Sequence, residues 1–121
     1  DNENTFDLPE NHQDYGKNVA AYYFFLFPNM MFNFYPWGLS VNVVKPKSPE
    51  ETQIEYFTYV WKEELMEKGA GSGLDKVELE DEEIVESVQK GIKSKAYDRG
   101  RYSPRREIGV YYFHKLIQKY Y

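Results

Sequence analysis

The feature that most restricts the fold is an aromatic and β-branched segment, residues 21–61, which turn-forming residues cut into short pieces. The cuts fall at Pro28-Asn29, at Pro36-Trp37-Gly38 and at Lys45-Pro46-Lys47-Ser48-Pro49. Links this short join antiparallel neighbours, because a parallel connection needs a crossover of about a dozen residues or more. The segment therefore predicts an antiparallel meander of four strands, at residues 21–27, 30–35, 39–44 and 52–61.

The third predicted strand shows how its residues divide between two faces. Leu39, Val41 and Val43 alternate with Ser40 and Asn42, so one face is apolar and the other is partly polar. Core packing accounts for such an aromatic sheet, and the wall of a ligand pocket is the functional alternative. Four side chains are expected to be the polar groups of such a pocket wall: Asn33, Asn42, Tyr56 and Tyr59.

An acidic helix is predicted after the sheet, around residues 77–91. Its period places Asp81 on the same face as the apolar side chains Ile84, Val85, Val88 and Ile92. A carboxylate that faces the interior loses hydration and needs a cation, a hydrogen-bond donor or a metal. The alternative is that Asp81 lies in the first helical turn, where the helix dipole favours acids. The periodicity leaves both explanations open.

The remaining segments complete an α+β layout, in which C-terminal helices pack on an antiparallel sheet. Residues 1–19 are expected to be a polar lead-in or the remnant of an upstream element, and residues 20–121 the domain proper. Residues 69–73 are rich in glycine but lack the phosphate-loop pattern, so they predict a flexible loop. Ser103-Pro104 predicts the start of a final helix. Arg105 and Arg106 would then oppose the helix dipole, and we expect them to pair with carboxylates.

Composition excludes several classes of protein. The net charge of −5 argues against a nucleic-acid partner, and the absence of cysteine excludes disulfides and thiolate metal sites within the chain. His12 and His114 lack the surroundings of a catalytic base beside a nucleophile. The sequence shows neither an apolar run of roughly 20 residues nor a signal-peptide pattern. We expect a cytoplasmic protein with no membrane partner.

Six motifs stand in order along the chain. They are Phe27-Pro28-Asn29-Met30, Tyr35-Pro36-Trp37-Gly38-Leu39-Ser40-Val41-Asn42, Val77-Glu78-Leu79-Glu80-Asp81, Glu86-Ser87-Val88-Gln89-Lys90-Gly91, Ala96-Tyr97-Asp98-Arg99-Gly100-Arg101-Tyr102 and Phe113-His114-Lys115-Leu116. Together they resemble the C-terminal part of the large (alpha) subunit of Rieske non-haem iron oxygenases. The resemblance extends from about Ala20 to the end and includes both the aromatic-ring dioxygenase and the choline monooxygenase branches.

The resemblance implies a helix-grip (START/Bet v1-like) fold and a mononuclear Fe(II) held by two histidines and one carboxylate. The family's carboxylate comes from a Glu-x-Glu/Asp-Asp pattern, which matches Glu78-Leu79-Glu80-Asp81, so the implied metal ligand is Asp81. Glu78 would either support that ligand or be solvated. The cysteine and histidine motifs of the family's 2Fe-2S Rieske cluster and its iron-histidine segment are absent from this sequence. We therefore expect that the chain alone neither binds iron tightly nor catalyses a reaction.

For the complete subunit, the resemblance implies hydroxylation of an aromatic or quaternary-amine substrate with O2. It also implies a reductase or ferredoxin electron donor and a homotrimer. Tyr and Phe side chains suit either substrate, by ring packing or by cation–π contact. Two further classes stay open from the sequence: a non-catalytic helix-grip module that binds a small apolar ligand, and an acidic protein-interaction domain.

Overall fold

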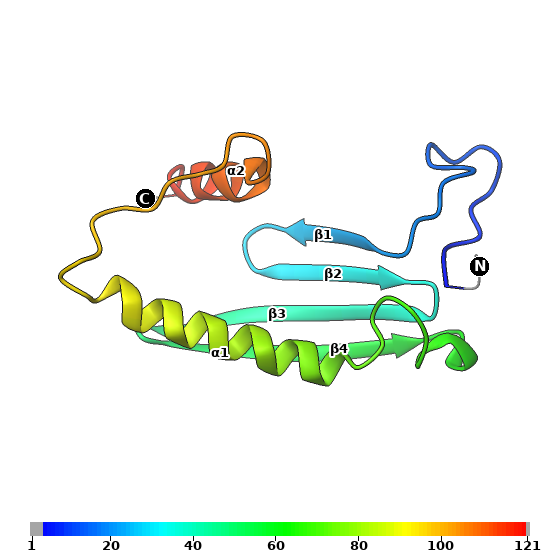
Figure 1. The fold of residues 1–121 in the computed structure, drawn as a ribbon, viewed down its shortest axis with the longest axis horizontal. Helices are drawn as coiled ribbons and strands as arrows, with labels where there is room; N and C mark the ends of the chain where they lie inside the picture. Colours follow the sequence, from blue (N-terminus) through cyan, green and yellow to red (C-terminus); the bar gives the residue numbers. More distant parts are fainter. Residues whose placement is uncertain (1–3, 121) are drawn as a thin grey trace. The chain divides into compact units, whose positions relative to one another are not determined.

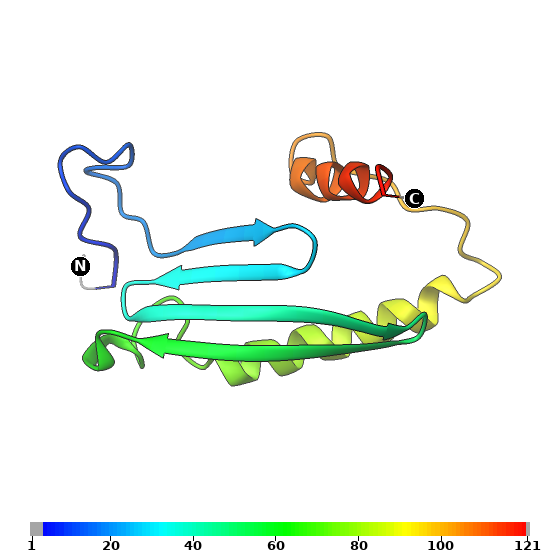
Figure 2. The same cartoon turned by 180° about the vertical axis from the view of Figure 1, so that it is seen from behind.

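The computed structural model describes residues 4–120, and the chain divides into two compact units, Asp1–Leu74 and Asp75–Tyr121. The first unit is built on a four-stranded sheet in the order β1-β2-β3-β4 (Figure 1). The strands are β1 (Tyr22–Leu26), β2 (Met30–Tyr35), β3 (Gly38–Ser48) and β4 (Glu51–Val60). All three pairings are antiparallel and join consecutive strands, as Figure 2 shows from behind. The meander that the short links predict is confirmed.

β3 is longer than the sequence predicts, because it continues through Pro46 to Ser48. β2 pairs with β3 only as far as Met30 opposite Val43, and beyond that point β3 pairs with β4 alone. The N–H of Val44 points to the β2 side, where it donates to Asn29 O over 2.9 Å. The backbone nitrogen of Pro46, two residues after Val44, faces the same side, where no β2 residue lies opposite. Because proline has no N–H group, this position has no donor to satisfy, and no β2 acceptor is left without a partner. A proline at such an edge removes no ladder hydrogen bond, so the predicted break at residue 45 was wrong.

The cross-strand register divides the side chains between two faces. Residues directly opposite one another share a face, and Tyr22, Phe34, Leu39 and Tyr59 form one such row across all four strands. We call this side the aromatic face; its rings are Tyr22, Phe24, Phe32, Phe34, Phe57 and Tyr59. We call the other side the mixed face; it carries Asn33, Ser40, Asn42 and Tyr56 together with apolar residues.

The most buried residues gather where β2 turns into β3. Trp37 is 0% exposed and stacks on Tyr35, with ring centroids 5.1 Å apart and planes 8° from parallel. Trp37 O accepts hydrogen bonds from the N–H groups of Trp61 and Lys62, both over 3.0 Å. These bonds tie the β2–β3 turn to the end of β4. The motif Tyr35-Pro36-Trp37-Gly38 is thus a structural centre of the sheet unit.

Helices follow the sheet, which confirms the α+β class. A short 3-10 helix, η1 (Glu63–Leu65), follows β4, and two α-helices, α1 (Leu74–Ile92) and α2 (Ile108–Ile117), lie further along the chain. No helix within residues 4–120 is long and apolar enough to cross a membrane.

The final helix begins later than predicted. Residues 104–106 form a turn, and α2 starts at Ile108 and not next to Ser103. The Glu107 carboxylate accepts a hydrogen bond from Ser103 N over 2.5 Å, and Glu107 N donates to Ser103 O over 3.0 Å, so these contacts close the turn. Starting after Arg105 and Arg106 keeps both cations out of the first helical turn, where the dipole disfavours them. The salt bridges of the described residues include neither arginine, so their expected pairing is not observed.

Candidate functional site

Asp81 lies well inside helix α1. The helix begins at Leu74, so Asp81 follows that residue by seven positions, about two turns. The helix dipole acts on the first turn and falls off beyond it. The dipole therefore does not account for an acid at position 81, and this structural explanation loses its support.

The face of α1 that carries Asp81 is exposed. Ile84, Val85 and Val88, which share this face, are 60%, 66% and 56% exposed, and Asp81 is exposed with them. Apolar side chains at helical spacing normally pack on another surface. The described residues of the second unit do not cover this face of α1. The burial of Asp81 therefore stays a prediction.

The other acids of α1 have different surroundings. Glu80 lies 3.8 Å from Lys76 Nζ in an exposed ion pair one turn apart, and Glu78 is half-buried. An ion pair this exposed contributes little to stability. Asp81, in contrast, is exposed and shares the face of the helix's apolar side chains.

A complete metal site is not present among the described residues, since residues 4–120 bring together no group of three His, Cys, Asp or Glu side chains. His114 is engaged through Nδ1 with the hydroxyl of Tyr102. An exposed carboxylate such as Asp81 is a suitable oxygen donor for Fe(II). Asp81 is therefore a candidate oxygen ligand, and the described residues do not hold the further ligands that an iron site needs.

The sheet brings three of the four predicted pocket residues together. Asn33, Asn42 and Tyr56 lie on the mixed face, with Asn42 directly opposite Tyr56. Ser40, also on this face, donates a 3.0 Å hydrogen bond from Oγ to Asn42 Oδ1. Tyr59 lies opposite Leu39 on the aromatic face. A single wall of the sheet cannot use all four residues.

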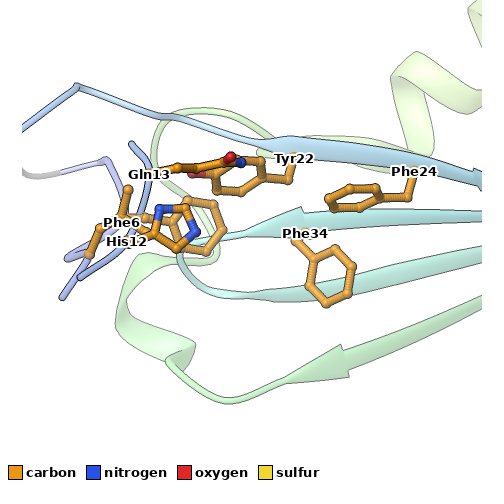
Figure 3. A pocket seen from close by; sticks show the side chains of 7 residues that line it. Phe6, His12, Gln13, Tyr22, Phe24 and Phe34 are labelled. Atoms are coloured by element: carbon orange, nitrogen blue, oxygen red, sulfur yellow. The ribbon is translucent and has the colours of Figure 1, made fainter. Parts of the chain in front are cut away.

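A hollow of about 410 Å³ lies on the aromatic face, under the segment that precedes β1 (Figure 3). Tyr22, Phe24 and Phe34 form its floor. Phe6, Leu8, His12 and Gln13 complete its lining, and sequence reasoning missed all four. Phe6 and Leu8 are apolar residues in a polar segment, which was the available signal.

Hydrogen bonds fix the wall of this hollow. Phe6 N donates to Val19 O over 2.9 Å, and the rings of Phe6 and Tyr22 lie 5.3 Å apart. The Tyr22 hydroxyl donates to Asp14 Oδ2 over 3.0 Å, and Lys17 Nζ lies 2.7 Å from Asp14 Oδ1. The hydrogen bonds from Lys17 and Tyr22 lower the pKa of Asp14, while desolvation and the bond to Asp14 raise the pKa of Tyr22.

A meander sheet followed by a helix with a carboxylate among its apolar side chains is the arrangement expected for the C-terminal part of an oxygenase catalytic domain. The model of the family "Ring hydroxylating alpha subunit (catalytic domain)" matches residues 2–121, so the chain belongs to this family. The resemblance found in the sequence is thereby confirmed.

Among curated proteins, the chain is similar to choline monooxygenases named as chloroplastic. It is 37% identical to that of Arabidopsis thaliana over 102 residues, which are 80% of this chain and 24% of the relative. It is 36% identical to that of Atriplex hortensis, over 79% of this chain and 23% of the relative. The chain is 32% identical to the choline monooxygenase of Spinacia oleracea, over 84% of this chain and 24% of the relative. The chain thus spans about a quarter of the length of these relatives. No solved structure matches the chain significantly.

Proposed function

We propose that the complete subunit is a Rieske-type non-haem iron oxygenase and that Asp81 is the carboxylate ligand of its mononuclear Fe(II). The observation that carries the proposal is the position of Asp81 within a family catalytic domain, beyond the first turn of α1 and on that helix's apolar face. Glu78, half-buried one turn earlier, would orient the ligand through hydrogen bonds. The remaining ligands, two histidines, would come from outside the described residues.

Iron held by Asp81 and two histidines would supply O2 chemistry beside the substrate, because three protein ligands leave coordination positions open. The chain's own contribution is to hold one carboxylate on a rigid helix and to supply part of the substrate wall. Asn33, Asn42 and Tyr56 on the mixed face are the candidates for polar contacts to the substrate. Tyr59 belongs to the other face and would act elsewhere.

A helix-grip domain would give the exposed apolar face of α1 a partner, because such a fold curves its sheet around a long helix. We propose that the C-terminal helices pack on the sheet in the complete subunit. The electron donor would be a reductase or ferredoxin, delivering through a 2Fe-2S Rieske cluster, and the subunits would form a homotrimer. The cytoplasmic location is a prediction; the relatives are named as chloroplastic.

For the substrate, we favour a small quaternary amine over an aromatic ring. The named relatives are choline monooxygenases, and tyrosine and phenylalanine rings attract quaternary ammonium groups by cation–π contact. Turnover of choline and of benzoate by the complete subunit, supplied with a reductase and a ferredoxin, distinguishes the two classes. Hydroxylation of benzoate alone would contradict the substrate assignment and leave the iron assignment intact.

The ligand assignment is tested with Asp81→Ala in the complete subunit. We expect hydroxylation to be abolished and the mononuclear iron content to fall, while the visible spectrum of the Rieske cluster stays unchanged. Glu83→Ala is the matched control, because it removes an exposed acid from the same helix but from another face. Normal activity of Asp81→Ala would refute the assignment.

A further inference from the structure

The buried Trp37 is hydrogen-bonded to the loop that leads into α1. Its indole Nε1 donates to Ala70 O over 3.2 Å, a contact that joins residues 33 positions apart. The ring is fully buried and stacked on Tyr35, so the donor has a fixed position and direction. A buried indole N–H needs such a partner, since an unsatisfied donor is costly. The glycine-rich loop is thereby attached to the sheet at Ala70.

Gly71 strengthens this attachment by close contact. A Cβ added to Gly71 would lie 2.8 Å from Tyr35 Cδ1 and 2.9 Å from Trp37 Nε1, so the backbone lies directly on the two rings. Its φ of +81° is a conformation that glycine adopts without strain. Both the space and the backbone angle thus require glycine here. The centre of the loop is packed, although its composition predicted flexibility.

The attachment lies close in sequence to the start of α1. Leu74 begins the helix three residues after Gly71, and three residues span at most about 11 Å. From Leu74 to Asp81 the chain is continuous helix, which is a stiff element. The position of the first residue of α1 is therefore restricted by a bond to the sheet.

From these contacts we propose that Trp37 is a positioning residue for Asp81, acting through Ala70 and Gly71 on the start of α1. The proposal rests on the proposed function, in which Asp81 binds iron. Trp37 does not touch the metal or the substrate in this role. It limits where the ligand helix begins, and a metal site depends on such restraint, because ligand geometry must hold within a fraction of an ångström.

The test compares Trp37→Phe with two controls. Trp37→Phe keeps an aromatic ring for Tyr35 but removes the donor to Ala70 O. Val41→Ala truncates another buried side chain of the sheet without touching the loop, so it controls for lost stability. Trp61→Phe removes an indole donor whose 3.0 Å bond goes to Pro36 O and not to the loop.

The first measurement is hydrogen exchange of the backbone amides of residues 70–76 in the 121-residue chain. We expect Trp37→Phe to accelerate exchange about fivefold, the factor that corresponds to one net hydrogen bond. Val41→Ala and Trp61→Phe should leave these amides close to the parent rate. Acceleration in Trp37→Phe no larger than in Val41→Ala would overturn the proposal.

The second measurement is the rate at which the complete subunit loses mononuclear iron to a chelator, with the Rieske spectrum as an internal reference. We expect Trp37→Phe to lose iron several-fold faster than both controls. An unchanged rate would overturn the positioning role, even if amide exchange increased. If Asp81→Ala keeps its iron, the proposed function fails instead, which separates the two failures. Gly71→Ala displaces the loop but keeps Trp37, and serves if Trp37→Phe does not fold.

Discussion

At the scale of single residues, Gly38 is the glycine of the sheet at which the backbone leaves no room for a side chain. A Cβ at this position would lie 2.4 Å from Tyr59 O, because β3 and β4 approach closely beside the Gly38–Val60 pair. We expect Gly38→Ala to lower the free energy of unfolding by about 1–3 kcal/mol, as overpacking at a rigid site does. Urea denaturation followed by tryptophan fluorescence measures this change.

Gly109→Ala is the matched control for that substitution. Gly109 lies in α2, and a Cβ there would meet no atom within 4 Å. Alanine has the higher helix propensity, so this variant should be neutral or slightly more stable. Equal destabilisation by the two substitutions would mean that the close approach at Gly38 is not the cause.

The sequence predicts the faces within one strand, whereas matching the faces of two strands needs their register. The alternation within one strand correctly separated Leu39, Val41 and Val43 from Ser40 and Asn42. Alternation within β4 also separates Tyr56 from Tyr59, which lie three positions apart, but the pairing across the β3–β4 hairpin decides which of them shares the face of Asn42. That pairing contains a register shift between Pro46 and Ser48. A shift of one residue exchanges the two faces, and the sequence does not show where it falls.

At the scale of elements, Asp14 couples the segment before β1 to that strand. The pKa of Asp14 is lowered, first by the Lys17 hydrogen bond and then by that of Tyr22. A depressed pKa stabilises the fold above the ordinary aspartate pKa, and this contribution is lost as pH falls through the folded-state value. The raised pKa of Tyr22 works in the opposite sense, so the contact weakens as pH rises through that value.

We expect an NMR titration of the Asp14 carboxyl carbon to give a pKa below that of the same residue in a short peptide. Lys17→Met should move the pKa of Asp14 upward, because it removes the largest cause of the shift. Lys47→Met, remote in sequence on the exposed end of β3, is the control. If the two variants give the same Asp14 titration, the ion pair with Lys17 does not lower the pKa.

Elements were largely predictable from the sequence, and their ends were not. Turn residues between aromatic runs identified all four strands, and β2 has the predicted bounds, Met30–Tyr35. The start of α2 was wrong, because Ser103 and Pro104 favour a helix start locally while Glu107 holds Ser103 in a preceding turn. The long-range bond of Trp37 to Ala70 O had no signal in local sequence.

At the scale of the whole molecule, the described chain supplies one candidate iron ligand and much exposed apolar surface. Side chains from β1, α1 and α2 are exposed, among them Phe24, Leu26 and Ile108. We expect the purified 121-residue chain to hold far less than one iron per molecule after desalting, measured by elemental analysis. The complete subunit is the positive control, and stoichiometric, tightly held iron in the short chain would contradict the proposal that histidines from elsewhere complete the site.

The unequal lengths of the strands have one more consequence. Beyond Val43, β3 and β4 continue as a two-stranded ribbon whose tip, at Pro49 and Glu50, is exposed. Residues added at that tip would lengthen a loop without breaking any pairing of β1 or β2, and loop length costs little free energy. The tip is therefore the natural insertion point for a peptide tag or a fluorescent label in this domain.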